Sequence, residues 1–420
     1  MELVKTEQKN FNDYLEFLDP ETISEFEALL QQLQGKKIAM VSATCYGGGV
    51  AEKLHSLVPL LNDLGLDVDW WVISGCTNQF YNVTKSFHNC LQGQEGSLEE
   101  RDIEIFLHYN ELNAFPMQDW HYDYFVIHDP QPAALIHYRE KRAGEKWIWR
   151  CHIDTSTPNM AYWNFLYRYI SRYDACIFSM PDYVKENHGL QNLTFITPSI
   201  DPLSFKNIPL TRERAQEIVG NFGIDINRPL ISQISRFDPW KDPLGVLDVY
   251  RIVKKELPEV QLALVGSMAH DDPEGWDYLY RTLRKAGEDY DIKVVTNFNG
   301  ITGLEVNAFQ TVSDVVLQKS LREGFGLTVA EALWKGRPVI GGKVGGIKLQ
   351  IEDGVNGYLV STVEECAEKA LNLLRNPMLV RQMSENGREK VRKQFLVTKN
   401  ALAYLKLFAK LENRTLARNL

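Results

Sequence analysis

Short apolar runs alternate along this chain with longer amphipathic segments, and this alternation limits the possible folds more than any other feature of the sequence. Runs rich in β-branched and aromatic residues lie at 36–43, 66–74, 122–129, 146–154 and 174–180. Helix-period segments separate them. Apolar runs of this length between helices are typical of parallel strands that are buried on both faces. The first half of the chain therefore predicts an α/β domain with helices on both sides of a parallel sheet.

A second series of the same kind begins after Phe205. Pro198 and Pro202 precede this point, and the helical pattern weakens there. Further strands are predicted at 228–235, 260–267, 292–298, 314–320 and 337–343. A chain of 420 residues is also too long for one comfortable core. Two doubly wound, Rossmann-like domains are therefore expected.

The expected domain limits follow from these two series. The N-terminal domain is predicted at residues 1–205, including a helical leader at 1–34, and the C-terminal domain at 206–385. Residues 386–420 are predicted to form a helix whose apolar face packs on the N-terminal domain. Ligands of such sheets bind at the carboxyl ends of the strands, so we expect chemistry in a cleft between two facing domains.

Composition excludes several classes of protein. The net charge of −9 argues against a protein that binds nucleic acid along its phosphates. There is no run of 18 apolar residues and no hydrophobic core of a signal peptide, so a cytoplasmic protein with no membrane partner is expected. The six cysteines form no CxxC pair and indicate free thiols in a reducing compartment.

The stretch EGFGLTVAEAL carries two glutamates, Glu323 and Glu331, between a predicted strand and the helix that follows it. Backbone N–H groups at a helix start favour anions, and glycine lets a phosphate approach closely. Glu331 is placed to accept hydrogen bonds from a ribose, and Glu323 lies nearer to the group attached to the phosphates. The predicted nucleotide-sugar turn is Gly324, Phe325, Gly326, Leu327 and Thr328. Alternatively, Glu331 pairs with Lys335 and Glu323 is a solvated loop residue.

A second motif, SRFDPWKDP, follows the predicted strand at 228–235. Arg236 and Lys241 flank a tight Asp-Pro turn there, and two cations at one strand end could neutralise a diphosphate leaving group. The alternative is that they pair locally with Asp238 and Asp242.

The N-terminal domain has its own glycine loop, Gly47, Gly48 and Gly49, between the first predicted strand and a helix. Its backbone amides could contact phosphate or sugar, although a simple tight turn is the alternative. The loop does not match the dinucleotide fingerprint, because Glu52 stands where that pattern needs its third glycine.

His152 and Asp154 lie at the carboxyl end of the predicted strand at 146–154. His152 could donate to a sugar hydroxyl or to charge that develops in a transition state, whereas local capping is the alternative role. Asp154 is a candidate contact for an acceptor. The DxD tripeptides at 67–69 and 289–291 lie at strand entrances and are not expected to bind metal, and no other metal-ligand spacing is present.

Together these motifs resemble the retaining GT4 family of glycosyltransferases, which have the GT-B fold. Glu323 and Glu331 are similar to its EX7E signature, Arg236 and Lys241 to its Arg/Lys pair, and residues 47–49 to its first glycine loop. The stretches YGGGVAEKLHSLVPLLNDLGLDVDWWVISG, WRCHIDTSTPN and QISRFDPWKDPLGVLDVY look like the trehalose glycosyltransferring synthases, relatives of the retaining trehalose phosphorylases.

The resemblance implies transfer of glucose from a nucleoside-diphosphate glucose, with ADP or UDP, to free glucose to form α,α-trehalose, and it allows the reverse reaction. It implies that Arg236 and Lys241 bind the diphosphate, that Glu331 binds the ribose, and that Glu323 and His152 contact the donor sugar. Gly48 and Gly49 would approach the donor as well. No cofactor is obligatory and no divalent metal is required for the chemistry; a homodimer is compatible with the sequence.

Other functions stay open at this point. A trehalose phosphorylase would use the same cations for inorganic phosphate, although Glu331 would then have no ribose. Another GT4 acceptor sugar is a further alternative. A noncatalytic sensor of sugar or nucleotide is disfavoured by the intact motif set, and a dehydrogenase by the missing third glycine.

Overall fold

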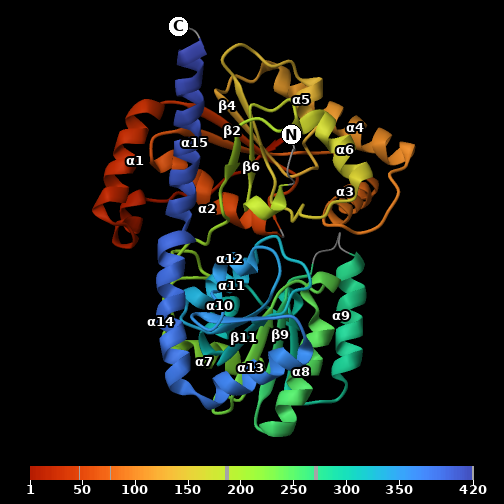
Figure 1. The fold of residues 1–420 in the computed structure, drawn as a ribbon, viewed down its shortest axis with the longest axis vertical. Coiled ribbons are helices and arrows are strands. Elements are labelled where there is room, and N and C mark those ends of the chain that lie inside the picture. Colours follow the sequence, from red (N-terminus) through yellow and green to blue (C-terminus); the bar gives the residue numbers. More distant parts are fainter. Residues whose placement is uncertain (47, 76, 185–188, 269–272, 419–420) are drawn as a thin grey trace. The chain divides into compact units, whose positions relative to one another are not determined.

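The computed structural model describes residues 1–46, 48–75, 77–184, 189–268 and 273–418, which form two compact units (Figure 1). Unit 1 comprises Met1–Pro198 and Val397–Leu420, and unit 2 comprises Ser199–Leu396. The boundaries predicted at 205 and 385 are therefore not the positions at which the chain changes units. It does so just after the last strand of unit 1 and just before its final helix.

Unit 1 is built on a seven-stranded sheet with the order β1-β3-β2-β4-β5-β6-β7. All neighbouring strands are parallel except β1, which runs antiparallel to β3. The strands are β1 (Glu2–Leu3), β2 (Lys37–Ser42), β3 (Asp67–Val72), β4 (Tyr124–His128), β5 (Lys146–Arg150), β6 (Ala175–Phe178) and β7 (Leu193–Phe195). The helices are α1 (Pro20–Leu33), α2 (Gly49–Asp63), α3 (Asn78–Leu91), α4 (Glu100–Ala114), α5 (Leu135–Tyr138), α6 (Met160–Ile170) and α15 (Val397–Arg418), with 3-10 turns at Phe11–Phe17, Phe115–Asp119 and Pro181–Tyr183.

The leader at 1–34 is helical only in part, which corrects the prediction. It begins with β1, continues through a 3-10 turn, and becomes α-helical at Pro20. The side chain of Asp19 accepts the N–H of Thr22 at 2.7 Å, and Pro20 occupies the first helical position. The helix begins at Pro20 because Asp19 satisfies an N–H that has no intrahelical partner and Pro20 has no N–H to satisfy.

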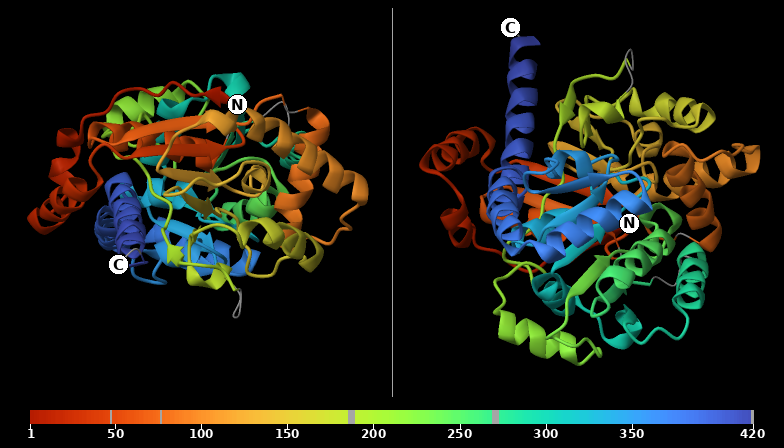
Figure 2. Two further views of the ribbon diagram at one scale, coloured as in Figure 1. Left: turned by 90° about the horizontal axis from the view of Figure 1, so that it is seen from above. Right: turned by 60° about the horizontal axis from the view of Figure 1, so that its bottom comes forward.

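Helix α15 completes unit 1 and lies against α1 and α2 (Figure 1). The views in Figure 2 agree, since blue α15 runs close to red α1 in both. The ring of Tyr124 on β4 lies 4.5 Å from that of Phe408 on α15. The hydroxyl of Tyr124 also donates to Glu412 at 2.6 Å. The final helix is therefore part of the core of this unit.

Unit 2 is built on a six-stranded, fully parallel sheet with the order β10-β9-β8-β11-β12-β13. The strands are β8 (Leu230–Ile234), β9 (Gln261–Gly266), β10 (Ile292–Thr296), β11 (Val315–Gln318), β12 (Val339–Gly342) and β13 (Gly357–Val360). The helices are α7 (Arg212–Gly220), α8 (Pro243–Glu256), α9 (Pro273–Ala286), α10 (Gly303–Val312), α11 (Leu327–Trp334), α12 (Ile347–Gln350), α13 (Val363–Arg375) and α14 (Pro377–Gln394), with 3-10 turns at Pro239–Lys241 and Asn297–Asn299. Both sheets thus have the doubly wound, parallel α/β architecture that the sequence predicts.

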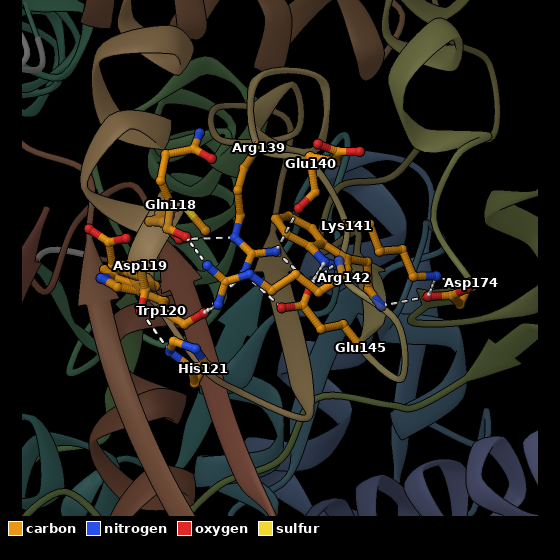
Figure 3. Close-up of polar contacts among 12 residues, drawn as sticks. Gln118, Asp119, Trp120, His121, Arg139, Glu140, Lys141, Arg142, Glu145 and Asp174 are labelled. Atoms are coloured by element: carbon orange, nitrogen blue, oxygen red, sulfur yellow. Dashed lines mark hydrogen bonds and ion pairs between the residues drawn. The ribbon is translucent and has the colours of Figure 1, made fainter.

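A buried ion pair between Arg139 and Glu145 lies at the amino end of β5 in unit 1 (Figure 3). This is the end of the strand opposite to the expected ligand site. Arg139 and Glu145 are exposed for only 1% and 6%, and their two bonds measure 2.5 and 2.7 Å. Arg139 also donates to the carbonyls of Met117 at 2.9 Å and Trp120 at 3.0 Å. Its guanidinium lies 4.8 Å from the centre of the Phe125 ring. This arginine joins three segments of the chain.

The cysteines among the described residues form no disulfide. Cys45, Cys90, Cys151, Cys176 and Cys366 are free cysteines, and the sixth lies outside the described residues. Within the same part of the chain, no helix combines the length and apolar character needed to cross a membrane.

Candidate functional site

In unit 2, the segment after β8 is folded by its two Asp-Pro pairs. Asp238 starts a 3-10 turn, and its Oδ1 accepts the N–H of Lys241 at 3.1 Å. Asp242 has a positive φ of 50° and starts α8, since its Oδ1 accepts the N–H of Gly245 at 3.0 Å. Because each aspartate caps one helical segment and each proline occupies its start, the backbone that carries Lys241 is held at the carboxyl end of β8.

Lys241 reaches across the site to Glu323. Its Nζ lies 2.5 Å from Glu323 Oε2, and the same oxygen accepts from Ser320 at 3.2 Å and Gln318 at 3.3 Å. The expected alternative, in which Glu323 is a solvated loop residue, is wrong, because this residue is only 7% exposed.

The local pairing proposed for the two cations holds in one case only. Asp242 pairs with Lys319 at 2.5 Å, whereas Lys241 pairs with Glu323. Arg236 lies near Asp238, with 3.9 Å between Nη2 and Oδ2, and its side chain is 43% exposed. A long contact of this kind in water is weak, and the 43% exposure means that part of the side chain is open to solvent.

The turn before α11 is shaped by glycine. Gly326 is the N-cap residue with φ of 80°, and a Cβ there would lie 3.2 Å from Glu323 Cγ. Gln350 holds the turn by donating to the carbonyl of Phe325 at 2.5 Å, and Thr328 donates to the carbonyl of Ile234 at 2.9 Å. Because the N-cap residue is glycine, it has no side chain to accept from the first N–H groups of α11, which suits the binding of an anion.

Glu331 lies inside α11 and is 2% exposed. Its Oε2 accepts from Gln310 at 2.9 Å, and its Oε1 lies 3.8 Å from Lys206 Nζ. Lys335, its proposed local partner, donates to Asn207 at 2.8 Å and to the backbone carbonyl of Glu331 at 3.3 Å. The carboxylate is therefore held by α10 and by the segment that precedes α7.

In unit 1, the glycine loop leads into α2. Gly47 lies outside the described residues. Gly48 is the N-cap residue of α2, Gly49 is its first residue, and both are exposed. Gly48 has extended backbone, and a Cβ built there would meet none of the described atoms within 4 Å. Neither conformation nor packing requires glycine at position 48, so the open space is compatible with close approach by a ligand.

His152 follows β5 and is held on three sides within unit 1. Its Nδ1 lies 2.7 Å from Lys53 Nζ, and its Nε2 lies 3.0 Å from Nδ1 of His128, the last residue of β4. The two imidazole rings are nearly parallel at 5.3 Å. The carboxylate of Asp129 accepts the backbone N–H of His152 at 2.7 Å. Asp129 itself has a φ of 65°, a conformation that costs energy for a residue other than glycine.

The ionisation of this cluster is perturbed. Burial, with further contributions from Lys53 and Arg150, lowers the pKa of His128 and of His152 well below the ordinary value. Burial raises the pKa of Asp129 to about 6, against the opposing effect of the His152 N–H. Perturbed groups of this kind concentrate at functional sites.

Asp154 has a local role in the structure. It is 5% exposed, and its Oδ1 accepts from the backbone N–H of Ser156 at 3.0 Å and from its hydroxyl at 2.6 Å. These bonds form a turn after β5. Contact with an acceptor stays a prediction.

Sequence reasoning missed the partners of these residues, namely Lys53, His128, Asp129, Arg150 and Gln310. One signal could have found two of them: His128 and Asp129 stand at the carboxyl end of β4, next to β5 in the sheet, where the strand-end rule places ligands. Among the described residues, no group of three or more His, Cys, Asp or Glu side chains could hold a metal ion.

Two family models match this chain, one in its N-terminal half and one in its C-terminal half. Residues 40–185 match the family model for the trehalose synthase N-terminal domain, and residues 215–390 match glycosyl transferases group 1. A trehalose synthase from Thermococcus litoralis is 51% identical over 402 residues, which cover 96% of this chain and 97% of that protein. A trehalose phosphorylase from Pleurotus pulmonarius is 28% identical over 447 residues, covering 95% of this chain and 60% of the relative.

Solved structures agree with the fold. A sucrose-phosphate synthase from Thermosynechococcus elongatus superposes with a TM-score of 0.72 at 16% identity, over 90% of this chain and 100% of that chain. The Anabaena HepE protein in complex with UDP-glucose gives 0.66 at 16% identity, over 89% and 99%. These likenesses show the GT-B fold that the motifs predicted. Since the identity to the Thermococcus protein extends over nearly the whole of both chains, this chain belongs to the trehalose synthase family.

Proposed function

We propose that this protein is a retaining glycosyltransferase that moves glucose from ADP- or UDP-glucose to free glucose and forms α,α-trehalose in a reversible reaction. The observation that carries the proposal is the contact between Lys241 and Glu323 at the start of α11. It brings both motifs of unit 2 to one place, beside N–H groups that suit a phosphate. The membership in the trehalose synthase family supports the choice of sugar, and the UDP-glucose bound by the Anabaena neighbour supports the choice of donor.

The first chemical requirement is departure of the nucleoside diphosphate. The bond between the anomeric carbon and the phosphate oxygen breaks, and the sugar becomes oxocarbenium-like while negative charge grows on the leaving oxygen. Preorganised cations stabilise that charge more than they stabilise the ground state. We assign this role to Lys241 and the partly exposed Arg236, with the first N–H groups of α11 as further donors. No divalent metal is needed in this scheme.

Retention is proposed to follow a front-face course. The acceptor hydroxyl attacks the anomeric carbon on the face that the diphosphate leaves, and its proton passes to the leaving phosphate oxygen. Glu323 would otherwise be the candidate nucleophile of a double displacement. Its Oε2 already accepts from Lys241, Ser320 and Gln318, and so many donors make a carboxylate oxygen a poor nucleophile. We therefore give Glu323 the role of orienting Lys241 and contacting the hydroxyls of the donor sugar.

The remaining residues are assigned to other parts of the nucleotide-sugar donor and to the acceptor. Glu331, held by Gln310, is proposed to accept from the ribose hydroxyls. His152 is proposed to contact the donor glucose, and Gly48 and Gly49 to admit its phosphate or sugar. Asp154 is assigned to the acceptor.

Product analysis tests the proposal. The protein is incubated with ADP- or UDP-glucose and glucose, and in parallel with glucose 1-phosphate and glucose. Trehalose with an equal amount of nucleoside diphosphate in the first reaction alone is expected, with a rate that a chelator does not change. Trehalose with phosphate release in the second alone would instead establish a phosphorylase, the activity of the Pleurotus relative.

Variants test the site within the same assay. Arg236→Ala and Lys241→Met are each expected to abolish turnover while the circular dichroism spectrum is unchanged, because the leaving group loses its cation. Lys369→Met is the control, since Lys369 lies on α13 and contacts Glu368 at 3.1 Å and the Tyr358 ring at 5.3 Å, and neither partner is assigned to the site. Near-normal turnover of Lys241→Met would refute the assignment.

A further inference from the structure

The contacts of His152 form a continuous chain of three side chains, Lys53, His152 and His128. Lys53 comes from α2, His128 ends β4, and His152 follows β5. Both ring nitrogens of His152 are engaged, Nδ1 by Lys53 at 2.7 Å and Nε2 by His128 at 3.0 Å. The sequence motifs and the family comparisons assign nothing to Lys53 or His128. The three residues also line one small cavity of about 10 Å³, large enough for about one water molecule.

Neutral imidazoles give this chain a direction. A neutral ring has one nitrogen that donates and one that accepts, so the state of one end decides every bond along the chain. Burial, Lys53 and Arg150 lower the pKa of both histidines, which favours the neutral rings. A lysine ammonium has donors only. If Lys53 donates to Nδ1 of His152, then Nε2 of His152 carries the proton and donates to Nδ1 of His128.

With this direction, the far end of the chain requires an acceptor. His128 must then carry its proton on Nε2, and that atom is buried with no hydrogen-bond partner among the described residues. Arg150 lines the same cavity as His128, and its Nε and Nη1 are also buried without a hydrogen-bond partner among the described residues. Buried donors on two residues that line one water-sized space call for an acceptor such as a water oxygen.

The charge on Lys53 is set by several neighbours. Burial and Arg150 lower its pKa well below the ordinary value, whereas Asp129 and Glu52 act in the opposite direction. Acidic conditions therefore favour the ammonium and the direction described above.

We propose that Lys53 and His128 are positioning residues that hold His152 as the tautomer with its proton on Nε2. Lys53 fixes the tautomer by donating to Nδ1, and His128 holds the resulting N–H through its own Nδ1. The role of this tautomer rests on the proposed function. In the complex, an oxygen of the donor sugar replaces His128 Nδ1 as the acceptor of the His152 Nε2–H group. A ring free to change tautomer would present a lone pair instead for part of the time.

Nitrogen-15 NMR of histidine-labelled protein tests the tautomer without any turnover. Protonated and unprotonated ring nitrogens have well separated shifts, and the His152 signals are assigned by their loss in His152→Asn. At slightly acidic pH we expect a protonated Nε2 and an unprotonated Nδ1 in the wild type, and a mixture in Lys53→Met. Lys37→Met, which changes an exposed lysine of β2 with a 3.5 Å contact to Asp67, should leave the signals as they are. An Nδ1 proton on wild-type His152, or an unchanged tautomer in Lys53→Met, would overturn the proposal.

Kinetics separates positioning from binding. Lys53→Met is expected to lower kcat about 10- to 100-fold, the effect of losing one charge-assisted hydrogen bond, with the donor KM little changed. His128→Asn keeps an acceptor near the position of Nδ1 and should retain far more activity than His128→Phe, whereas equal losses would contradict the role of His128. If the wild type makes no trehalose, the proposed function fails, and the NMR result still decides the tautomer.

Discussion

Replacing Arg139 by methionine should destabilise unit 1 strongly, because it leaves Glu145 buried without its ion-pair partner. Glu145 would keep only the N–H of Arg142 at 3.0 Å and the indole of Trp147 at 3.4 Å. Removing one member of a buried ion pair costs about 3–5 kcal/mol. The carbonyl of Met117 also loses its donor, so we expect a loss near the upper part of that range, about 4 kcal/mol. For a unit of this size, the midpoint of thermal unfolding should fall by about 8–16 °C.

Differential scanning calorimetry measures this shift, and two further variants control it. Lys406→Met in the same unit breaks an ion pair with Glu25 whose members are 51% and 43% exposed, and such pairs contribute at most about 1 kcal/mol. The double variant Arg139→Met with Glu145→Leu should recover part of the loss, because it removes the unpaired buried charge. A shift for Arg139→Met no larger than that for Lys406→Met, or no recovery in the double variant, would refute the reasoning.

Three more substitutions test local stability, and the two glycine substitutions also test binding of the donor. Gly326→Ala should destabilise unit 2 by about 1 kcal/mol or more and raise the donor KM, because φ is 80° and the new Cβ approaches Glu323; an unchanged unfolding midpoint would contradict this. Gly48→Ala should change stability by less than about 0.5 kcal/mol, since its Cβ has open space, yet reduce kcat/KM for the donor about tenfold; unaltered kinetics would remove Gly48 from the site. Hydrogen bonds from Arg228, with help from Lys254, lower the pKa of Asp291 to about 2, so its stabilisation is present above about pH 4 and is lost as pH falls towards the folded pKa. Asp291→Asn should therefore cost about 1 kcal/mol at neutral pH, allowing for solvent screening, and less near pH 3; urea unfolding at both pH values tests this, and an equal cost at both would argue against it.

The central strands of both sheets could be predicted from the sequence because they are buried on both faces. All ten apolar runs identified in the sequence are strands, from β2 to β12. The three strands that were not predicted, β1, β7 and β13, each lie at an edge of a sheet. These three edge strands are short and partly solvated, as the 42% exposure of Phe195 on β7 illustrates, so no apolar run marks them. The fourth edge strand, β10, was predicted because its sequence IKVVT is an apolar, β-branched run.

The residues of the candidate site that belong to a linear motif could be predicted. Their partners, which they contact only in the folded chain, could not. The turn from Glu323 to Glu331 and the cations of SRFDPWKDP are visible as local patterns. The partner of Lys241 is not, because Glu323 lies 82 positions later and Asp242 stands next to Lys241 in the sequence. Likewise, Lys53 meets His152 across 99 positions, and only the order of β2, β4 and β5 in the sheet brings their two segments together.

Because α15 belongs to unit 1, the order of synthesis determines the order in which the two units can complete their folding. Tyr124 on β4 pairs with a glutamate 288 positions later, so the first unit to be synthesised is the last whose core can close. Unit 2, whose residues are contiguous, can fold as soon as its own strands have emerged. Until α15 has been synthesised, the apolar face of unit 1 that receives it is exposed to solvent. A truncation that removes α15 should therefore impair the N-terminal half of the protein, far from the cut in sequence.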